Sequence, residues 1–162
     1  MNKEEQVMMG FWDLFNKKIL LDGLKMKDSL KGYKPSELHC MEYIEKNIDS
    51  NVTKLAEFFY MTRSAISKIT KKLIEKGLIE SYQRPENKKE IYFRLTEHGK
   101  AVNKIHEELH KESQERDKAV FEQTTEVQFD SMLSFVELYN QHLEEEIKKL
   151  GVDMKSGCCD KL

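Results

Sequence analysis

The sequence predicts a mainly α-helical fold that carries one small β-hairpin. Three observations support this class. Apolar residues recur at three- and four-residue steps over most of the chain, one short stretch alternates polar and apolar side chains, and only 2 prolines and 7 glycines interrupt the 162 residues. A β-sandwich rich in turns needs many residues with special φ angles, so the composition argues against that class.

The composition also limits where the protein works. Charged residues make up 35% of the chain, and every apolar run is far shorter than the ~20 residues of a membrane span. The N-terminus lacks the basic, apolar and cleavage segments of a secretory signal. Two of the 3 cysteines are adjacent and distant from Cys40, which does not suit a disulfide framework. We expect a cytoplasmic, reduced protein without a membrane segment.

The first segment predicts a long amphipathic helix. Its apolar stripe is wide enough to dock on another surface, and it consists of Val7, Met8, Phe11, Trp12, Phe15, Ile19 and Leu20. Gly23, Gly32 and Pro35 are expected to bracket a loop of mixed charge.

Three shorter helices should follow. Pro35 suits a first helical turn, and the apolar face of that helix is expected to be Leu38, Met41, Ile44 and Ile48. Asn51 is a candidate N-cap for a short helix that carries Leu55, Ala56 and Phe59. Thr62 should cap the next helix, whose apolar positions are Ile66, Ile69, Leu73 and Ile74 and which should end at Gly77.

Beyond Gly77 the periodicity changes to two, which predicts a hairpin. The expected strands cover 79–83 and 91–95, joined by the mostly basic tip 84–89. Thr96 should then cap a helix that begins on an apolar face and turns strongly polar over 110–118. Thr125 and Gln128 form a capping-box pattern ahead of a last amphipathic helix. We therefore divide the chain into an N-terminal helix and loop (1–34), a domain of short helices and a hairpin (35–100), C-terminal helices (101–150) and a flexible tail (151–162).

Two short helices joined by a tight turn and followed by a hairpin predict a winged helix-turn-helix. The segment 54–100 holds 11 Lys and Arg against 6 Glu, although the whole chain has a net charge of −2. A helix with a basic, acid-free face suits double-stranded DNA. The candidate DNA-binding residues are Thr62, Arg63, Ser64, Ser67, Lys68 and Lys71 on the helix and Arg84, Asn87, Lys88 and Lys89 on the wing. The alternatives are a solvated lysine face and a winged helix that serves as a protein-interaction adaptor.

Four motifs in this order resemble the MarR family of bacterial transcription regulators. They are Val52–Glu57, Thr62–Lys68, Leu73–Ile79 and Arg94–Lys100, and the likeness extends from about Pro35 to Leu109. The resemblance implies a homodimer with interlocked terminal helices, a pseudo-palindromic operator, a repressor role and a small effector. In that arrangement 35–100 is the winged helix-turn-helix DNA-binding domain, and 1–34 and 101–150 form a helical dimerisation region. Two departures stand out. Tyr60 occupies the place of a usual turn glycine, and Asn87 and Lys88 replace the usual Asp and Arg of the wing tip.

Three histidines form a candidate metal site. His106 and His110 lie one helical turn apart, and His39 lies on an earlier helix. The zinc-responsive members of the family use histidines at similar places, with a carboxylate whose counterpart here is Asp22. We require no cofactor and regard Zn²⁺ as a candidate effector. The alternative is that His106 and His110 are ordinary exposed residues and His39 is buried.

Residues 106–110 also read H-E-x-x-H, the zinc-protease pattern. That motif is short and common in Glu-rich helices, and its surroundings are those of a winged helix. We therefore expect no enzyme. Cys40 should point into the core, and Cys158 and Cys159 are treated as a tail without a site.

Overall fold

The computed structural model describes residues 1–152, and they fold as a mainly helical protein with one antiparallel hairpin. This confirms the predicted fold class. The elements in chain order are α1 (Lys3–Ser29), α2 (Pro35–Lys46), α3 (Val52–Phe59), α4 (Arg63–Glu75), β1 (Ile79–Arg84), β2 (Asn87–Leu95), α5 (Glu97–Glu122) and α6 (Glu126–Lys149).

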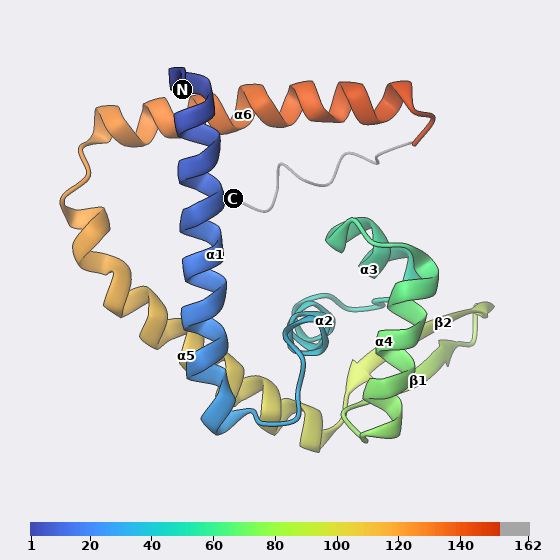
Figure 1. Ribbon diagram of the computed structural model, residues 1–162. Helices are drawn as coiled ribbons and strands as arrows, with labels where there is room; N and C mark the ends of the chain where they lie inside the picture. Colours follow the sequence, from blue (N-terminus) through green and yellow to red (C-terminus); the bar gives the residue numbers. More distant parts are fainter. Residues whose placement is uncertain (153–162) are drawn as a thin grey trace.

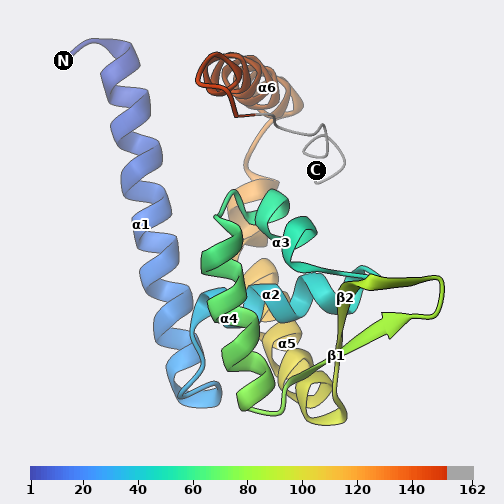
Figure 2. The same ribbon diagram turned by 90° about the vertical axis from the view of Figure 1, so that its right-hand side faces the viewer.

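The elements form a compact head and an open helical frame (Figure 1, Figure 2). Helices α2, α3 and α4 gather with the hairpin to make the head, and the long helices α1 and α5 flank it. Helix α6 lies across the N-terminal end of α1, away from the hairpin. Between residues 1 and 152, no helix combines the length and the apolar character that a bilayer crossing needs.

The predicted helix starts are confirmed by their capping bonds. Each cap side chain accepts a hydrogen bond from a backbone N–H three residues on, which satisfies a donor that the helix itself leaves free. The N···O distances are 2.9 Å at Asn51, 3.1 Å at Thr62, 3.0 Å at Thr96 and 3.3 Å at Thr125.

The apolar core lies inside the head. Its side chains come from α2, α3, α4, both strands and the start of α5, so burial holds the whole winged helix as one unit. Its largest fully buried members are Leu38, Met41, Leu55, Ile66, Leu73, Leu78 and Ile79. Cys40 is also buried, as predicted.

Three boundaries differ from the sequence prediction. Helix α1 runs through Gly23 to Ser29, so the loop is shorter than expected. Helix α2 ends at Lys46, and Ile48 is 82% exposed and not part of its apolar face. The Asn47 side chain ends this helix by donating to the Tyr43 carbonyl oxygen at 2.8 Å. Strand β2 begins at Asn87, so Lys88 and Lys89 belong to a strand instead of a free tip.

The head closes where α5 meets the turn between α4 and β1. The carbonyl oxygen of Leu78 accepts hydrogen bonds from the Thr96 backbone N–H at 3.0 Å and from its hydroxyl at 3.2 Å. One turn later Gly99 lies so close that an added Cβ would sit 1.9 Å from the same oxygen. A glycine is therefore required here by the close approach of two backbones.

Replacing Gly99 with Ala should destabilise the fold by about 2–3 kcal/mol, because the clash is with backbone and no flexible side chain can yield. Thermal unfolding followed by circular dichroism measures the loss. The matched control is Gly23→Ala in α1, where nothing lies within 4 Å of the added Cβ. That change should stabilise by up to about 1 kcal/mol. Equal melting temperatures for Gly99→Ala and the wild type would contradict the close packing.

Candidate functional site

Helix α4 presents a polar, acid-free face to solvent. Ile66, Thr70 and Leu73 pack inward, and the Thr70 hydroxyl donates to the Ile66 carbonyl oxygen at 3.1 Å. The opposite face carries the exposed residues Arg63, Ser64, Ser67, Lys68 and Lys71. The structure thus brings together the five predicted residues that lie within α4, and Thr62 precedes them with its hydroxyl engaged as the N-cap. Such a helix offers hydrogen-bond donors of the kind that phosphates and base edges accept.

The turn before α4 uses Tyr60 in a left-handed conformation. Its φ of 53° and ψ of 41° are those that favour glycine, and here a bulky aromatic residue adopts them at the C-cap of α3. The Met61 N–H bonds to the Ala56 carbonyl oxygen at 3.0 Å, which closes the turn. The tight helix-turn-helix geometry is therefore kept without glycine, and some backbone strain is stored beside the recognition helix.

The basic side chains of the head divide into paired and unpaired sets. Five of them lie within 3.1 Å of a carboxylate oxygen, namely Lys46 with Glu42, Lys76 with Glu37, Arg84 with Asp49, Arg94 with Glu80 and Lys100 with Glu97. Across residues 1–152, Arg63, Lys68, Lys71, Lys88 and Lys89 form no ion pair. These five unpaired charges lie on α4 and on the wing, so those two elements offer positive charge that no carboxylate neutralises.

Arg84 differs from the other predicted wing residues. Its guanidinium Nε donates to the Asp49 carboxylate oxygens at 2.8 and 3.0 Å, and those bonds together with one from Tyr82 hold the pKa of Asp49 below its ordinary value. Asn87 also has a local role, because its side-chain oxygen accepts from the Lys89 N–H at 3.3 Å. Lys88 and Lys89 remain exposed.

The three predicted histidines do come together, at the junction of α2 and α5. One donor atom from each of His39, His106 and His110 lies within 4.8 Å of the other two. The ring centroids of His106 and His110 are 4.3 Å apart. The alternative expectation of a buried His39 and an exposed His106 is wrong, because His39 is exposed and His106 is only 1% exposed.

The buried His106 ring lacks hydrogen bonds. Neither its Nδ1 nor its Nε2 has a partner within residues 1–152, and the same holds for Nε2 of His110. Burial lowers the pKa of His106 to about 4, with the neighbouring His110 as a further cause. The imidazole is therefore neutral at pH 7, which is the form that binds metal ions.

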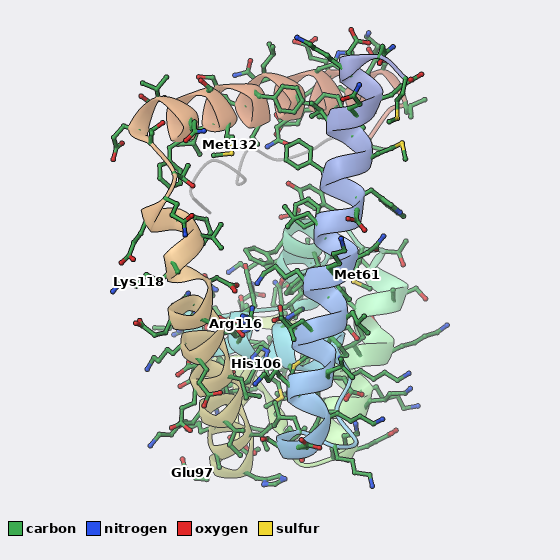
Figure 3. All side chains as sticks on the ribbon, turned by 60° about the vertical axis from the view of Figure 1, so that its left-hand side comes forward. Met61, Glu97, His106, Arg116, Lys118 and Met132 are labelled. Atoms are coloured by element: carbon green, nitrogen blue, oxygen red, sulfur yellow. The ribbon has the colours of Figure 1, made fainter. Side chains whose placement is uncertain are left out.

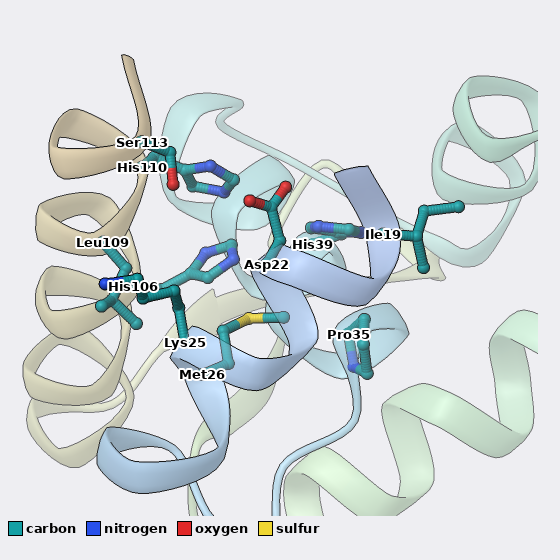
Figure 4. A pocket seen from close by; sticks show the side chains of 10 residues that line it. All are labelled: Ile19, Asp22, Lys25, Met26, Pro35, His39, His106, Leu109, His110 and Ser113. Atoms are coloured by element: carbon teal, nitrogen blue, oxygen red, sulfur yellow. The ribbon is translucent and has the colours of Figure 1, made fainter. Parts of the chain in front are cut away.

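Asp22 faces the same space from α1. Figure 4 shows its carboxylate pointing between the imidazole rings. Asp22 Oδ1 is buried without a hydrogen bond among the described residues and lies 3.8 Å from Arg116 Nη2, while Oδ2 lies 3.5 Å from Lys18 Nζ. Figure 3 shows α1 and α5 side by side, with His106 and Arg116 between them. A fourth ligand could therefore come from the segment that the resemblance indicated.

A cavity of about 110 Å³ lies among these groups. It is lined by Ile19, Asp22, Lys25, Met26, Pro35, His39, His106, Leu109, His110 and Ser113 (Figure 4). Drug-sized organic ligands occupy sites of roughly 300–1,000 Å³. The space suits an ion with one or two waters better than an organic effector of that size.

Two acidic residues of α2, Glu37 and Glu42, were not singled out from the sequence as functional residues. Glu37 is 2% exposed and accepts from the Lys76 ammonium at 2.7 Å and the Lys34 N–H at 3.1 Å. Burial alone would raise the pKa of Glu37. The two hydrogen bonds and the positive charges of Lys76 and Lys72 outweigh burial, so the pKa lies below its ordinary value. Its position three residues after the helix cap was the available signal. Glu42 places one oxygen 3.9 Å from His106 Nδ1 and 3.8 Å from His110 Nε2, too far for hydrogen bonds.

The H-E-x-x-H pattern is on one helix, as its spacing requires. Glu107 accepts a hydrogen bond from the Asn103 side chain at 3.1 Å. Cys158 and Cys159 lie outside the described residues.

Comparisons with known proteins agree on one family. The family model described as MarR family matches residues 34–91. The chain is 34% identical over 119 residues to the uncharacterized HTH-type transcriptional regulator YhjH of Bacillus subtilis (strain 168), covering 71% of this chain and 68% of that protein.

Two solved structures share the fold. Streptococcus pneumoniae FabT in complex with DNA superposes with a TM-score of 0.75 at 19% identity, covering 88% of this chain and 99% of that one. The adhesin competence repressor AdcR from Streptococcus pyogenes gives a TM-score of 0.68 at 18% identity, covering 88% and 98%. The winged-helix architecture is therefore shared over nearly the whole chain.

Lys68→Ala and Lys71→Ala should each weaken binding to every double-stranded DNA, because each removes a cation that no carboxylate neutralises. The slope of log affinity against log salt should flatten by about one per bound chain for each change. Arg63→Ala and Ser67→Ala should instead alter sequence preference. Fluorescence anisotropy at several salt concentrations measures both effects.

The matched control is Lys100→Ala, since Lys100 is exposed but paired with Glu97 at 3.1 Å. Its salt slope should equal that of the wild type. Unchanged slopes for both α4 lysine variants would show that this face does not meet DNA.

Proposed function

The chain belongs to the MarR family and is a DNA-binding transcriptional regulator; we propose that it acts as a homodimeric repressor on a pseudo-palindromic operator and that a metal ion, Zn²⁺ in the first place, modulates it. The observation that carries the proposal is the unpaired basic face of α4 next to an unpaired basic wing. A twofold dimer would place two such helices in major grooves one turn apart, so half-sites should be centred ~10 base pairs apart.

The apolar frame supports a homodimer. Across residues 1–152, neither α1 nor α6 contributes a buried side chain, yet both carry large apolar residues. Trp12 is 73% exposed, and Phe11 of α1 and Phe135 of α6 lie side by side with ring centroids 6.0 Å apart. An exposed apolar surface of this length on two adjoining helices suits burial against the same surface of a second copy.

Two considerations support repression. A dimer seated on a pseudo-palindrome excludes other proteins from that stretch of DNA. A structural neighbour, AdcR, is itself named a repressor. FabT, which shares the fold, was solved in complex with DNA, and this supports the proposed DNA contact of this chain.

The donor set supports a metal effector. Three imidazoles and the Asp22 carboxylate are the nitrogen and oxygen ligands that zinc binds tetrahedrally. Their unpartnered buried atoms cost about 1–3 kcal/mol each when left without a bond. Tetrahedral zinc ligands lie about 3.3 Å apart, so the three imidazole nitrogens, which now lie within 4.8 Å of one another, need only small side-chain rotations. When bound, the ion would supply a positive charge that joins α1, α2 and α5. Asp22 would then exchange Lys18 and Arg116 for the ion.

The function is tested by titrating the full chain onto labelled duplex DNA from beside its own coding region, with and without Zn²⁺. We expect a salt-sensitive complex with two chains per duplex and a zinc-dependent affinity. The adaptor alternative predicts no attraction to any duplex at low salt. Proteolysis of added casein in the presence of Zn²⁺ would support the enzyme alternative instead.

Trp12→Asp should convert the dimer to a monomer. The charge enters a surface that the second copy would cover, and loss of two buried indoles weakens association by roughly 100-fold or more. Sedimentation velocity measures the mass. Because Trp12 is exposed in the single chain, its replacement should leave the helical content unchanged. Gln6→Asp introduces the same charge on the exposed side of α1 about 120° around the helix from Trp12, outside the apolar stripe; it is the control and should remain dimeric. A dimer of normal affinity for Trp12→Asp would place the interface elsewhere.

His39→Ala and His110→Ala should each weaken Zn²⁺ binding by roughly 100-fold, because each removes one ligand from a partly exposed ring without opening the core. Competition against a chromophoric chelator measures the affinity. His142→Ala, an exposed histidine on α6, is the matched control and should bind as the wild type does. Wild-type zinc affinity in His39→Ala would exclude this cluster as the site.

A further inference from the structure

The turn between α2 and α3 is hydrogen-bonded to the wing through Asp49. The Asp49 carboxylate accepts a hydrogen bond from the Tyr82 hydroxyl at 2.7 Å and shares the Nε–H of Arg84 between its two oxygens at 2.8 and 3.0 Å. Both partners lie on β1. Asp49 itself adopts a left-handed conformation with φ 58°, which is uncommon for a residue other than glycine and is held here by the surrounding bonds.

The two residues after Asp49 hold the other strand. The Ser50 carbonyl oxygen accepts from the Phe93 N–H at 2.9 Å, and the Asn51 side chain donates to the Glu90 carboxylate at 3.2 Å. Three consecutive residues of one turn thus contact both strands of the hairpin. They also precede α3, so the wing is tied to the helix-turn-helix itself.

The contacts of Asp49 lie where the two strands of the hairpin lose their regular pairing. The ladder is regular as far as the pair Tyr82–Tyr92, and the next pair is Arg84–Asn87, with a register shift between them. Lys88 and Lys89 lie in the shifted part, and the Gln83 side chain donates to the Lys88 carbonyl oxygen at 2.7 Å. A bulge bends and re-aims the outer part of a strand. The direction of the basic outer wing therefore depends on contacts other than the ladder.

The contact also neutralises Arg84. Its side chain is 41% exposed and Asp49 is 26% exposed, so the pair is partly shielded from water. Glu86 adds a second carboxylate 3.9 Å from its Nη1. An arginine held by Nε to one carboxylate and close to another has little charge left for a phosphate.

Building on the DNA-binding function proposed above, we propose that Asp49 is a positioning residue that sets the angle of the wing on DNA. In this proposal Arg84 connects the wing to Asp49 and does not bind a phosphate. This replaces the sequence-based expectation that Arg84 contacts DNA. Lys88 and Lys89 keep that role.

The proposal predicts an effect whose sign opposes simple electrostatics. Asp49→Asn removes a negative charge near a polyanion, which by charge alone raises affinity. We expect the affinity to fall by roughly 5-fold or more, because the released wing must be ordered on binding. Asparagine tolerates the left-handed conformation, so the backbone of the turn is kept. Glu86→Gln removes the same charge at the wing tip but keeps the contact between Arg84 and Asp49, and its affinity for DNA should equal or exceed that of the wild type.

Arg84→Ala should lower the affinity while leaving the salt slope unchanged, whereas Lys88→Ala should flatten it by about one per bound chain. The double variant of Asp49→Asn and Arg84→Ala should bind no worse than Arg84→Ala, since both changes remove the same contact. In the free protein, amide hydrogens of residues 84–91 should exchange faster in Asp49→Asn than in the wild type.

The outcomes separate this proposal from the function on which it rests. A wild-type chain without salt-sensitive duplex binding would overturn both. A wild-type chain that binds, together with an Asp49→Asn variant that binds as tightly or more tightly, would overturn the positioning role alone. A flattened slope for Arg84→Ala would show a direct phosphate contact, and unchanged exchange at 84–91 would show that the turn does not hold the wing.

Discussion

The architecture depends on the close approach of Gly99 to the Leu78 carbonyl group. Leu78 lies between the end of α4 and the start of β1, and Gly99 lies in the first turn of α5. Strand β2 ends beside them, because its last residue, Leu95, pairs with Ile79. The Thr96 hydroxyl accepts from the Gly99 N–H and donates to the Gly77 carbonyl oxygen at 2.6 Å, which fixes the same corner from the side-chain end. This contact positions both the histidine cluster and the wing. Helix α5, which carries His106 and His110, starts at it, and the hairpin that forms the wing extends from its other side.

The sequence predicts the elements well because their signals are local. A cap residue, the backbone N–H that donates to it and the apolar stripe that follows lie within one or two helical turns, so Asn51, Thr62, Thr96 and Thr125 could all be identified by spacing. The boundary at Gly23 could not, since a single glycine costs a helix only about 1 kcal/mol and helix-forming residues on both sides continue through it. Ile48 was misplaced because α2 ends through a bond that the Asn47 side chain makes to the backbone.

The candidate site shows the limit of such reasoning more sharply. The histidine spacing predicts which rings meet, but the burial of His106 depends on how α1 and α2 pack on α5. Likewise the basic composition of 54–100 predicts a positive surface, whereas the partners of Lys76 and Arg84 lie 39 and 35 residues away in the chain. Only the three-dimensional arrangement separates basic side chains that stabilise the fold from basic side chains that face solvent. The solvent-facing side chains are the ones that can contact DNA.

One exposed side chain gives this protein a built-in optical reporter. The chain contains a single tryptophan, and that residue is Trp12 on the uncovered apolar face of α1. An indole in water emits at longer wavelength than one in an apolar contact, so the intrinsic emission spectrum of the unlabelled chain follows whatever covers α1, free of background from any second indole.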